Sequence, residues 1–291
     1  SASLVGSEMC IRDRFQFDHS FVLNSLKSSM EGYVFHNQPL DTDDLLEQTV
    51  KLFNSCKTSL ELFDMLHNMR AYDDSTHAHS LNVALICRRI GKWLKVDAAT
   101  LATLTLCGLL HDIGKLKIPD EILNKPGKYT DEEFDLVKRH TKFGYELLKT
   151  LNIDPHIKKA ALLHHERCDG SGYPLKATQK DLDDFSMVVA IADVYDAMTA
   201  ARSYRAPLCP FQVIERFEQE GLQKYKPKFI LTFLQHIAST YQNNRVLLSN
   251  GQSANIVMLN QQHLARPIVQ LNDNSCIDLS TRLDLHIQSI L

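Results

Sequence analysis

Two adjacent histidines, His164 and His165, stand at the end of an apolar helical run, and this placement constrains the chain more than any other feature. A carboxylate, Glu166, follows them, and then a short segment whose glycines and proline fix an unusual backbone path. Neutral imidazole is the commonest metal ligand in proteins. The sequence therefore raises the question of whether a helical fold brings further ligands to these two histidines.

Other histidines and aspartates lie on apolar helical patterns elsewhere in the chain. A lone histidine or a His-Asp pair says little, because a chain with 13 histidines produces such pairs by chance. Asp193 is more informative, because a carboxylate in an apolar helix needs a partner, a cation or a raised pKa; an ion pair with an arginine is the alternative. A helical bundle would bring these positions together in its interior. The candidates are His79, His111, Asp112, His140, His164, His165 and Asp193.

Mixed imidazole and carboxylate ligands favour iron, manganese or zinc over calcium. Asp112, beside His111, is the best candidate for a carboxylate that bridges two metals. Two metals about 3.5–4 Å apart deprotonate a bridging water and stabilise both oxygens of an in-line phosphoryl displacement. Lys115, one turn beyond Asp112, would reach a phosphate oxygen. Arg202 and Arg205 offer planar groups for phosphate, with a solvated helix end as the alternative.

Length and composition suit a globular protein. The chain has 291 residues, enough for one large domain or two smaller ones, and 44% of them are hydrophobic. A formal net charge of −3 gives no electrostatic case for binding a nucleic-acid polymer. We find no apolar run of about 18 residues and no signal-peptide pattern, so we expect no membrane span. The seven scattered cysteines are interpreted as reduced thiols, which predicts a cytoplasmic location.

The amino-terminal part is the least regular. Residues 1–14 show no usable periodicity and are interpreted as a tail, and residues 21–23 and 33–35 are interpreted as short strands. Apolar residues at helical spacing then predict one long helix over residues 41–66.

Helix starts are clearer further along the chain. Asp97 is a candidate N-cap, and Thr130 with Glu133 has the spacing of a capping box. The helix that Thr130 begins is expected to carry His140. Pro155 suits the first position of the helix that ends at the two adjacent histidines, and Pro210 and Pro227 begin two further helices.

After about residue 242 the pattern changes. Residues 245–248, 254–258 and 268–271 are β-prone, and Asn250-Gly251 signals a hairpin turn between the first two. The sequence therefore predicts an all-α helical bundle with a small C-terminal β appendage.

Together these residues resemble the HD-GYP subgroup of the HD phosphohydrolase superfamily. The resemblance is carried by His111-Asp112-Ile113-Gly114-Lys115 and by His164-His165-Glu166 with the following Asp-Gly-x-Gly-Tyr-Pro, and it covers about residues 60–240. It implies an enzyme with a bi- or trinuclear centre, usually of iron or manganese. It also implies hydrolysis of the bacterial second messenger cyclic di-GMP to linear pGpG, and often onward to GMP.

The resemblance also assigns residues by position. The metal ligands would be the seven candidates given above, with Asp112 and Lys115 catalytic and Lys115, Arg202 and Arg205 contacting the substrate phosphates. The motif loop, which the family links to diguanylate cyclase partners, comprises Asp169, Gly170, Gly172, Tyr173 and Pro174. The domain division is a tail and short N-terminal region, interpreted as a regulatory remnant, then the phosphohydrolase domain and a β-rich extension: residues 1–58, 59–242 and 243–291.

We expect two metal ions rather than three. In trinuclear members a glutamate one helical turn before the first histidine holds the extra ion, and here that position is Ser75. Asp74 is one residue further back, a step that rotates a helical side chain by about 100°. His77 is two residues from His79 and faces elsewhere on a helix.

Two other functions stay open. The same metal site would serve another cyclic dinucleotide, such as cyclic GMP-AMP, or a nucleotide. A catalytically weak effector that binds cyclic di-GMP or a cyclase is the other hypothesis, although the intact ligand set argues against it. A homodimer is left open.

Overall fold

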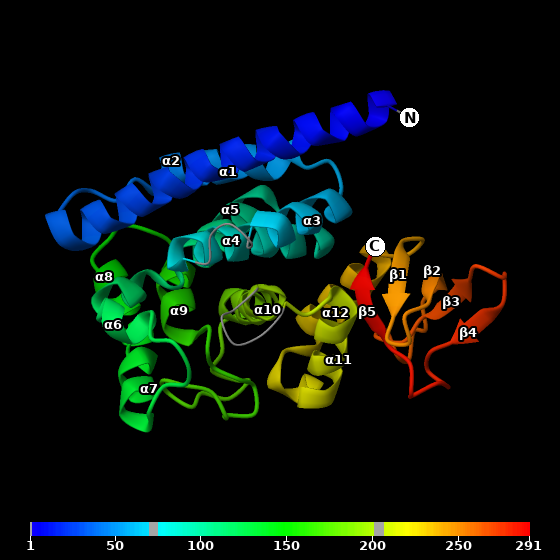
Figure 1. Ribbon diagram of the computed structural model, residues 1–291. Helices are drawn as coiled ribbons and strands as arrows, with labels where there is room; N and C mark the ends of the chain where they lie inside the picture. The colour runs from blue at the N-terminus through cyan, green and yellow to red at the C-terminus, as the bar shows by residue number, and fades with distance from the viewer. Residues whose placement is uncertain (1, 70–74, 201–206) are drawn as a thin grey trace.

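The computed structural model of the chain describes residues 2–69, 75–200 and 207–291, with side chains from residue 13 onward. Helices make up most of the structure and a small antiparallel sheet follows them, so the predicted fold class is confirmed (Figure 1). Apolar side chains of the helices and of one face of the sheet join in a single core. None of the described helices is long and apolar enough to cross a lipid bilayer.

Four helices occupy the centre of the fold: α4 (Thr76–Trp93), α5 (Ala98–Leu110), α9 (Pro155–Leu163) and α10 (Asp184–Thr199). Each packs against at least two of the others. A helix that is apolar around its whole circumference has to lie inside the core, and in α10 every residue from 186 to 193 is buried. A histidine or aspartate on such a helix is therefore carried into the core with its apolar neighbours.

The amino-terminal predictions of a tail and two short strands are wrong. Residues 2–36 form one helix, α1 (Ala2–His36), which packs against α4 and runs along one edge of the molecule (Figure 1). Its buried side chains Phe15, Val22, Leu26 and Met30 recur at helical spacing. The strands were expected from short groups of aromatic and branched residues. The helical spacing of the buried residues over the whole segment outweighs these local groups.

The single helix predicted over residues 41–66 is two helices, α2 (Thr42–Ser55) and α3 (Ser59–Met69). The break comes from a capping box at the start of α3. The Glu61 carboxylate accepts hydrogen bonds from the backbone N–H of Lys57 and Thr58, and Thr58 Oγ1 accepts one from the Glu61 N–H at 3.1 Å. These bonds favour a new helix start over a continuous helix.

The prediction that His140 lies within the helix begun at Thr130 also needs correction. The Thr130–Glu133 capping box is present, but its helix ends before His140, which begins the next helix. The predicted cap at Asp97 is confirmed, with a bond from the Thr100 N–H at 2.8 Å. Asp154, just before the predicted helix start at Pro155, accepts one from the His156 N–H at 2.9 Å. The remaining elements of this part are η1 (Ile113–Lys117), α6 (Asp120–Leu123), α7 (Asp131–Lys138) and α8 (His140–Leu148).

The carboxyl-terminal part consists of helices that begin at the predicted prolines, followed by a sheet. Its helices are α11 (Pro210–Glu220), η2 (Leu222–Lys224) and α12 (Pro227–Thr240). The antiparallel strands have the order β4-β3-β2-β1-β5. They are β1 (Arg245–Leu248), β2 (Ser253–Met258), β3 (Ile268–Leu271), β4 (Cys276–Asp278) and β5 (Ile287–Ile290).

Three of these strands were predicted, and so was the turn between β1 and β2. Gly251 in that turn has a φ of 83°, a conformation that favours glycine. Strands β4 and β5 were not predicted, because they lack the adjacent aliphatic residues that mark β1 and β3.

Candidate metal centre

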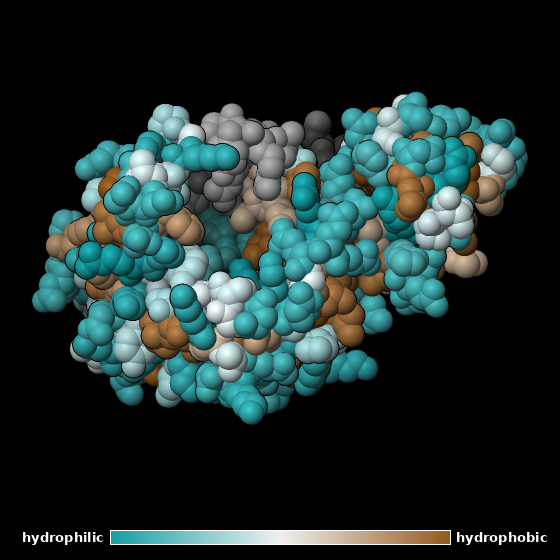
Figure 2. Space-filling model, turned by 90° about the horizontal axis from the view of Figure 1, so that it is seen from below, coloured by the Kyte–Doolittle hydropathy of each residue, from teal (hydrophilic) through white to brown (hydrophobic). Residues whose placement is uncertain are grey.

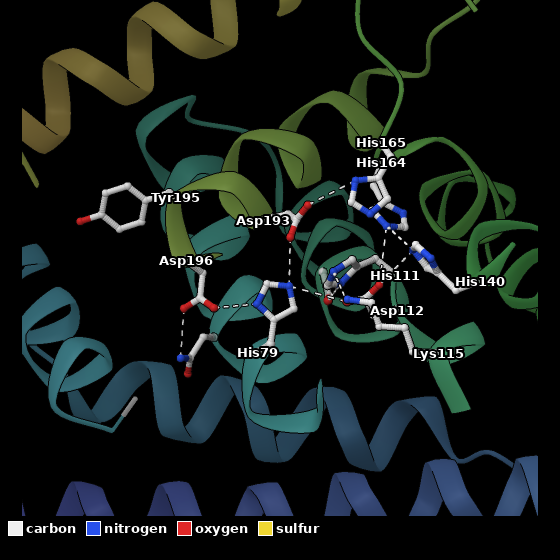
Figure 3. Close-up of polar contacts among 12 residues, drawn as sticks. His79, His111, Asp112, Lys115, His140, His164, His165, Asp193, Tyr195 and Asp196 are labelled. Atoms are coloured by element: carbon white, nitrogen blue, oxygen red, sulfur yellow. Dashed lines mark hydrogen bonds and ion pairs between the residues drawn. The ribbon is translucent and has the colours of Figure 1, made fainter. Parts of the chain in front are cut away.

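All seven predicted metal ligands converge at one point in the interior (Figure 3). Helix ends supply most of them, and α4 and α10 supply the other two from within their length. The side chains form two groups, within each of which the ligand atoms lie within 4.8 Å of one another. The first group is Asp112, His140, His164 and His165, and the second is His79, His111 and Asp193.

Asp112 lies between the two groups and turns one oxygen to each. Its Oδ1 is 3.3 Å from His140 Nε2 and 3.7 Å from His164 Nε2. Its Oδ2 is 3.3 Å from His111 Nε2 and 3.6 Å from His79 Nε2. A carboxylate in this position is able to bridge two cations.

Asp193 spans the same two groups from the opposite side. Its Oδ1 is 3.0 Å from Nε2 of His79, and its Oδ2 is 3.7 Å from Nδ1 of His165 (Figure 3). The sequence singled out Asp193 as a buried carboxylate in need of a partner. Its neighbours in the structure are imidazoles, and no arginine pairs with it among the ion pairs of the described residues.

Three of the histidines are oriented by their own helices. The ring Nδ1 lies 2.7 Å from Gly108 O in His111, 2.6 Å from Val137 O in His140 and 2.9 Å from Ala160 O in His164. A carbonyl oxygen only accepts, so each Nδ1 carries the proton and donates it. The lone pair then lies on Nε2, which is the atom that faces Asp112, and this is how metal-ligating histidines are commonly held.

The Nε2 atoms converge without satisfying one another. Those of His140 and His164 lie 3.3 Å apart, and with both protons on Nδ1 neither nitrogen has a hydrogen to donate. Within the described part of the chain, His111 Nε2 and Asp112 Oδ1 are buried and make no hydrogen bond. Buried polar atoms without partners are rare in native proteins. A divalent cation in each group would satisfy these atoms, so the residues present fit a metal centre.

Burial and charge set the protonation states that metal binding requires. Burial lowers the pKa of His140 to about 3, and it also lowers the pKa of His164 and His165. Burial acts to raise the pKa of the Asp112 carboxyl, but the charges of Lys115 and nearby histidines hold that pKa well below its usual range. His140, His164 and His165 are therefore neutral and face an ionised carboxylate, as metal binding requires, whereas at His79 the hydrogen bonds to Asp193 and Asp196 outweigh the effect of burial and raise the pKa.

Gly114 allows the segment that bears Asp112 to approach α8. A Cβ at Gly114 would collide with the backbone of His140 and of Gly144. Because no side chain intervenes, η1 packs directly on the first turn of α8, and Asp112 comes within reach of His140. The close packing of η1 on α8 thus explains why the His-Asp-Ile-Gly-Lys motif has glycine at position 114.

Lys115 lies at the edge of the centre. Its Nζ is 2.6 Å from Asp112 Oδ2, and its side chain is 23% exposed, against 1% for Asp112. The lysine therefore connects the buried carboxylate with the surface. On the face of the molecule seen in Figure 2, a hollow lies between the region of α6–α8 and that of α11 and α12.

The motif loop that follows the adjacent histidines packs directly against His165 and Glu166. A Cβ at Gly172 would collide with the backbone of His165 and Glu166, so only glycine fits there. The next residue, Tyr173, stacks its ring on that of His165, with centroids 4.7 Å apart, and the Tyr173–Pro174 peptide is cis. Asp169 and Gly170 lie at the outer turn, where Asp169 accepts a hydrogen bond from the Ser171 N–H.

Sequence reasoning did not assign a role to Glu166. Its carboxylate is fully buried and accepts hydrogen bonds from the backbone N–H of Leu175 at 2.6 Å and of Ala177 at 3.0 Å. These bonds hold the end of the motif loop against the adjacent histidines. The sequence signal for this role was an acidic residue directly after the two adjacent histidines, which are predicted ligands.

Asp196 was missed as well. It accepts a hydrogen bond from His79 Nδ1 at 2.7 Å and so does for His79 what backbone carbonyls do for three other histidines. Its spacing of three residues from Asp193 places both on one face of α10, and this spacing could have revealed it.

Three residues discussed from the sequence, Arg202, Arg205 and Asp74, lie outside the described residues. Ser75 is the N-cap of α4 and accepts a hydrogen bond from the Ala78 N–H at 3.2 Å.

The family model of the HD domain matches residues 44–229, well over half of the chain. The chain therefore belongs to the HD domain family. Its His-Asp, His-His-Glu and Gly-Tyr-Pro motifs are those of the HD-GYP subgroup, which confirms the resemblance.

Three curated relatives show the extent of the similarity. A cyclic di-GMP phosphodiesterase of Thermotoga maritima is 36% identical over 178 residues, covering 60% of this chain and 48% of that protein. Cyclic di-GMP phosphodiesterase PA4108 of Pseudomonas aeruginosa is 32% identical, covering 71% and 50%. The 3'3'-cGAMP-specific phosphodiesterase 2 of Vibrio cholerae is 34% identical, covering 62% and 35%. The chain thus spans half or less of the length of these relatives.

A solved structure supports the fold. Bd1817, an HDG"Y"P protein from Bdellovibrio bacteriovorus, matches with a TM-score of 0.61 at 18% identity, covering 75% of this chain and 71% of that one.

Proposed function

We propose that this protein is a metal-dependent phosphodiesterase that hydrolyses cyclic di-GMP to linear pGpG. The observation that carries the proposal is Asp112, whose two carboxylate oxygens each face a separate group of ligands. Two relatives at 36% and 32% identity are named cyclic di-GMP phosphodiesterases, which supports the substrate.

The proposed cofactor is a pair of divalent transition metal ions, iron or manganese. The ligands are the seven histidines and aspartates of the two groups, with Asp112 and Asp193 shared between them. When bound, such a pair activates water and stabilises charge on the phosphodiester oxygens. The mixture of imidazole and carboxylate ligands suits these metals.

The protein's own side chains have distinct tasks in this reaction. The Nδ1 bonds to helix carbonyls keep three histidine Nε2 lone pairs directed inward. Lys115, which pairs with the buried Asp112 carboxylate and is itself partly exposed, would contact a phosphate oxygen and offset its charge in the transition state. Arg202 and Arg205 would bind the phosphates, and Asp169, Gly170, Gly172, Tyr173 and Pro174 would shape the pocket and contact a diguanylate cyclase partner.

The remaining assignments belong to the same proposal. The division into residues 1–58, 59–242 and 243–291 follows the resemblance, with the phosphohydrolase unit in the middle. We also propose a cytoplasmic location, since the substrate is an intracellular messenger of bacteria.

A second substrate has a specific observation in its favour. The relative from Vibrio cholerae is named a 3'3'-cGAMP-specific phosphodiesterase and is 34% identical, which is between the values for the two cyclic di-GMP enzymes. Both messengers share the phosphodiester ring on which the centre would act, and they differ in one base.

The test incubates manganese-loaded protein with cyclic di-GMP and, separately, with 3'3'-cyclic GMP-AMP, and separates the products by chromatography. We expect pGpG from the first, and none from an Asp112→Ala variant that keeps its helical circular dichroism. Cleavage of cyclic GMP-AMP alone would assign the second substrate. Binding of cyclic di-GMP without any cleavage by metal-loaded protein would contradict the enzyme and favour an effector.

A further inference from the structure

A chain of buried polar side chains leads from the amino-terminal helix α1 to the metal centre. Nε2 of His19 on α1 lies 3.3 Å from Oδ1 of Asn82 on α4. Asn82 Nδ2 donates to Asp196 Oδ1 on α10 at 3.1 Å, and Asp196 Oδ2 accepts from Nδ1 of the predicted ligand His79 at 2.7 Å (Figure 3). Three helices that are distant in sequence thus meet in one hydrogen-bonded series.

The donors and acceptors of these hydrogen bonds can be assigned consistently along the series. Asn82 donates through its amide nitrogen to Asp196, so its oxygen is the atom that accepts from His19 Nε2. Asp196, an acceptor on both oxygens, then accepts a hydrogen bond from the protonated Nδ1 of His79. This leaves the His79 lone pair on Nε2, the atom that faces Asp112 and Asp193. Each member therefore fixes the orientation of the next.

Because the members of this series are buried, any of them left without a hydrogen-bond partner would destabilise the fold. His19 is 3% exposed, Asn82 0% and Asp196 2%. A buried polar group that loses its partner costs the free energy of its desolvation. The series persists among apolar neighbours because its members satisfy one another.

His79 is held differently from the other oriented histidines. His111, His140 and His164 donate to carbonyls of their own helices, so their orientation is a local property. His79 donates to a side chain on another helix, and through Asn82 that side chain is connected to α1. Residues 2–36 precede the segment that the HD domain model matches, which begins at residue 44. The placement of His79 thus depends on a helix outside that segment.

We infer that His19, Asn82 and Asp196 form a positioning chain by which α1 sets the orientation of His79 and hence the metal affinity of the group His79, His111 and Asp193. The inference rests on the proposed function only in that this group binds a divalent cation. A movement of α1 relative to α4 breaks the first bond of the chain and weakens metal binding without touching a ligand.

The test measures the Mn²⁺ dissociation constant by titration and the unfolding midpoint of the metal-free protein for the same variants. His19→Leu removes the donor, and His19→Gln keeps an N–H group at a similar distance. Val22→Ala, on the same helix, truncates a side chain that is 5% exposed and belongs to the core, outside the chain of polar contacts. Asp196→Asn keeps size while removing the charge that holds the His79 proton.

We expect Asp196→Asn to weaken binding at the affected site by about 10- to 100-fold, as for other residues that orient metal ligands. His19→Leu should weaken it by about two- to tenfold, the range for a remote member of a coupled network. His19→Gln should retain the wild-type dissociation constant. Val22→Ala should lower the unfolding midpoint and leave Mn²⁺ affinity unchanged.

Two results overturn the inference, and they are distinguishable. If His19→Leu and Val22→Ala both lower stability and neither changes Mn²⁺ affinity, the polar series has only a structural role. Should His19→Leu fail to fold, an unchanged dissociation constant in Asp196→Asn leads to the same conclusion. If the wild-type protein binds no Mn²⁺, the metal centre itself is wrong and both proposals fall.

Discussion

The candidate metal centre and the C-terminal sheet differ in which side chains they bury. In the sheet, side chains alternate, so that Val246, Ile256, Val269 and Ile287 are buried while their neighbours on the strands are more exposed. At the centre, polar and apolar residues are buried alike, and the imidazoles and carboxylates converge on one another. The described residues of the sheet contain no group of histidines, cysteines or carboxylates able to hold a metal. Substitutions in the sheet should therefore change stability alone, and those at the centre should change chemistry.

Removal of the metal should produce the largest effect. The core that surrounds the centre is apolar and the histidines are held by protein groups, so the chelated protein should stay folded while hydrolysis of cyclic di-GMP falls to background. The measurement is product formation after treatment with a chelator, with circular dichroism on the same sample. Added Mn²⁺ should restore activity. Hydrolysis that survives chelation would show that the centre is not catalytic.

Lys115→Ala should slow turnover by about 10²–10³-fold with metal content unchanged, the usual loss for one charge-stabilising donor. The matched control is Lys117→Ala, which removes an exposed lysine two residues away whose Nζ lies 3.5 Å from Val34 O. Steady-state kinetics on metal-loaded variants measures the effect. Equal turnover in both variants would refute the role of Lys115.

A pair of glycines tests the comparison directly. Gly114→Ala places a methyl group against the backbone of His140, so we expect about 1–3 kcal/mol of destabilisation together with weaker Mn²⁺ binding. Gly251→Ala, in the turn between β1 and β2, meets no atom within 4 Å and strains only its positive φ, at about 1–2 kcal/mol. Denaturant unfolding and Mn²⁺ titration separate the two. Weaker Mn²⁺ binding in Gly251→Ala would mean that the regions are not independent.

Ile256→Val should have the smallest effect. It removes one methylene from a fully buried side chain in β2 and should cost about 0.5–1.5 kcal/mol of unfolding free energy. Denaturant unfolding measures the loss, and the Mn²⁺ dissociation constant of the variant should equal that of the wild type.

The sequence predicted the side chains that converge at the centre because they lie in short motifs, and it predicted the central helices because their apolar residues recur at helical spacing. It did not predict the helix at residues 2–36, whose buried stripe is narrow and includes a polar residue, His19. The break before α3 depends on local capping bonds that compete with a continuing apolar pattern. The helix before α8 ends where the Arg139 N–H bonds to the Leu136 carbonyl, three residues back, a backbone detail that side-chain periodicity does not reveal.

The residues that support the ligands were harder to find, for a physical reason. Glu166 and Asp196 act through hydrogen bonds to partners 9 to 117 positions away, and such pairings are set by the tertiary fold. A carboxylate beside a predicted ligand is a hint, but its partner is fixed only when the helices are packed.

The number of metal ions that depend on Asp112 tests the central claim most directly. Elemental analysis of folded, Mn²⁺-loaded protein should give about two ions per chain, because two ligand groups share this carboxylate. In Asp112→Ala both ions should be lost together, since one oxygen of Asp112 faces each group. A variant that keeps two ions, or loses only one, would contradict a bridging Asp112, and a reproducible ratio near three in the wild type would contradict the binuclear centre.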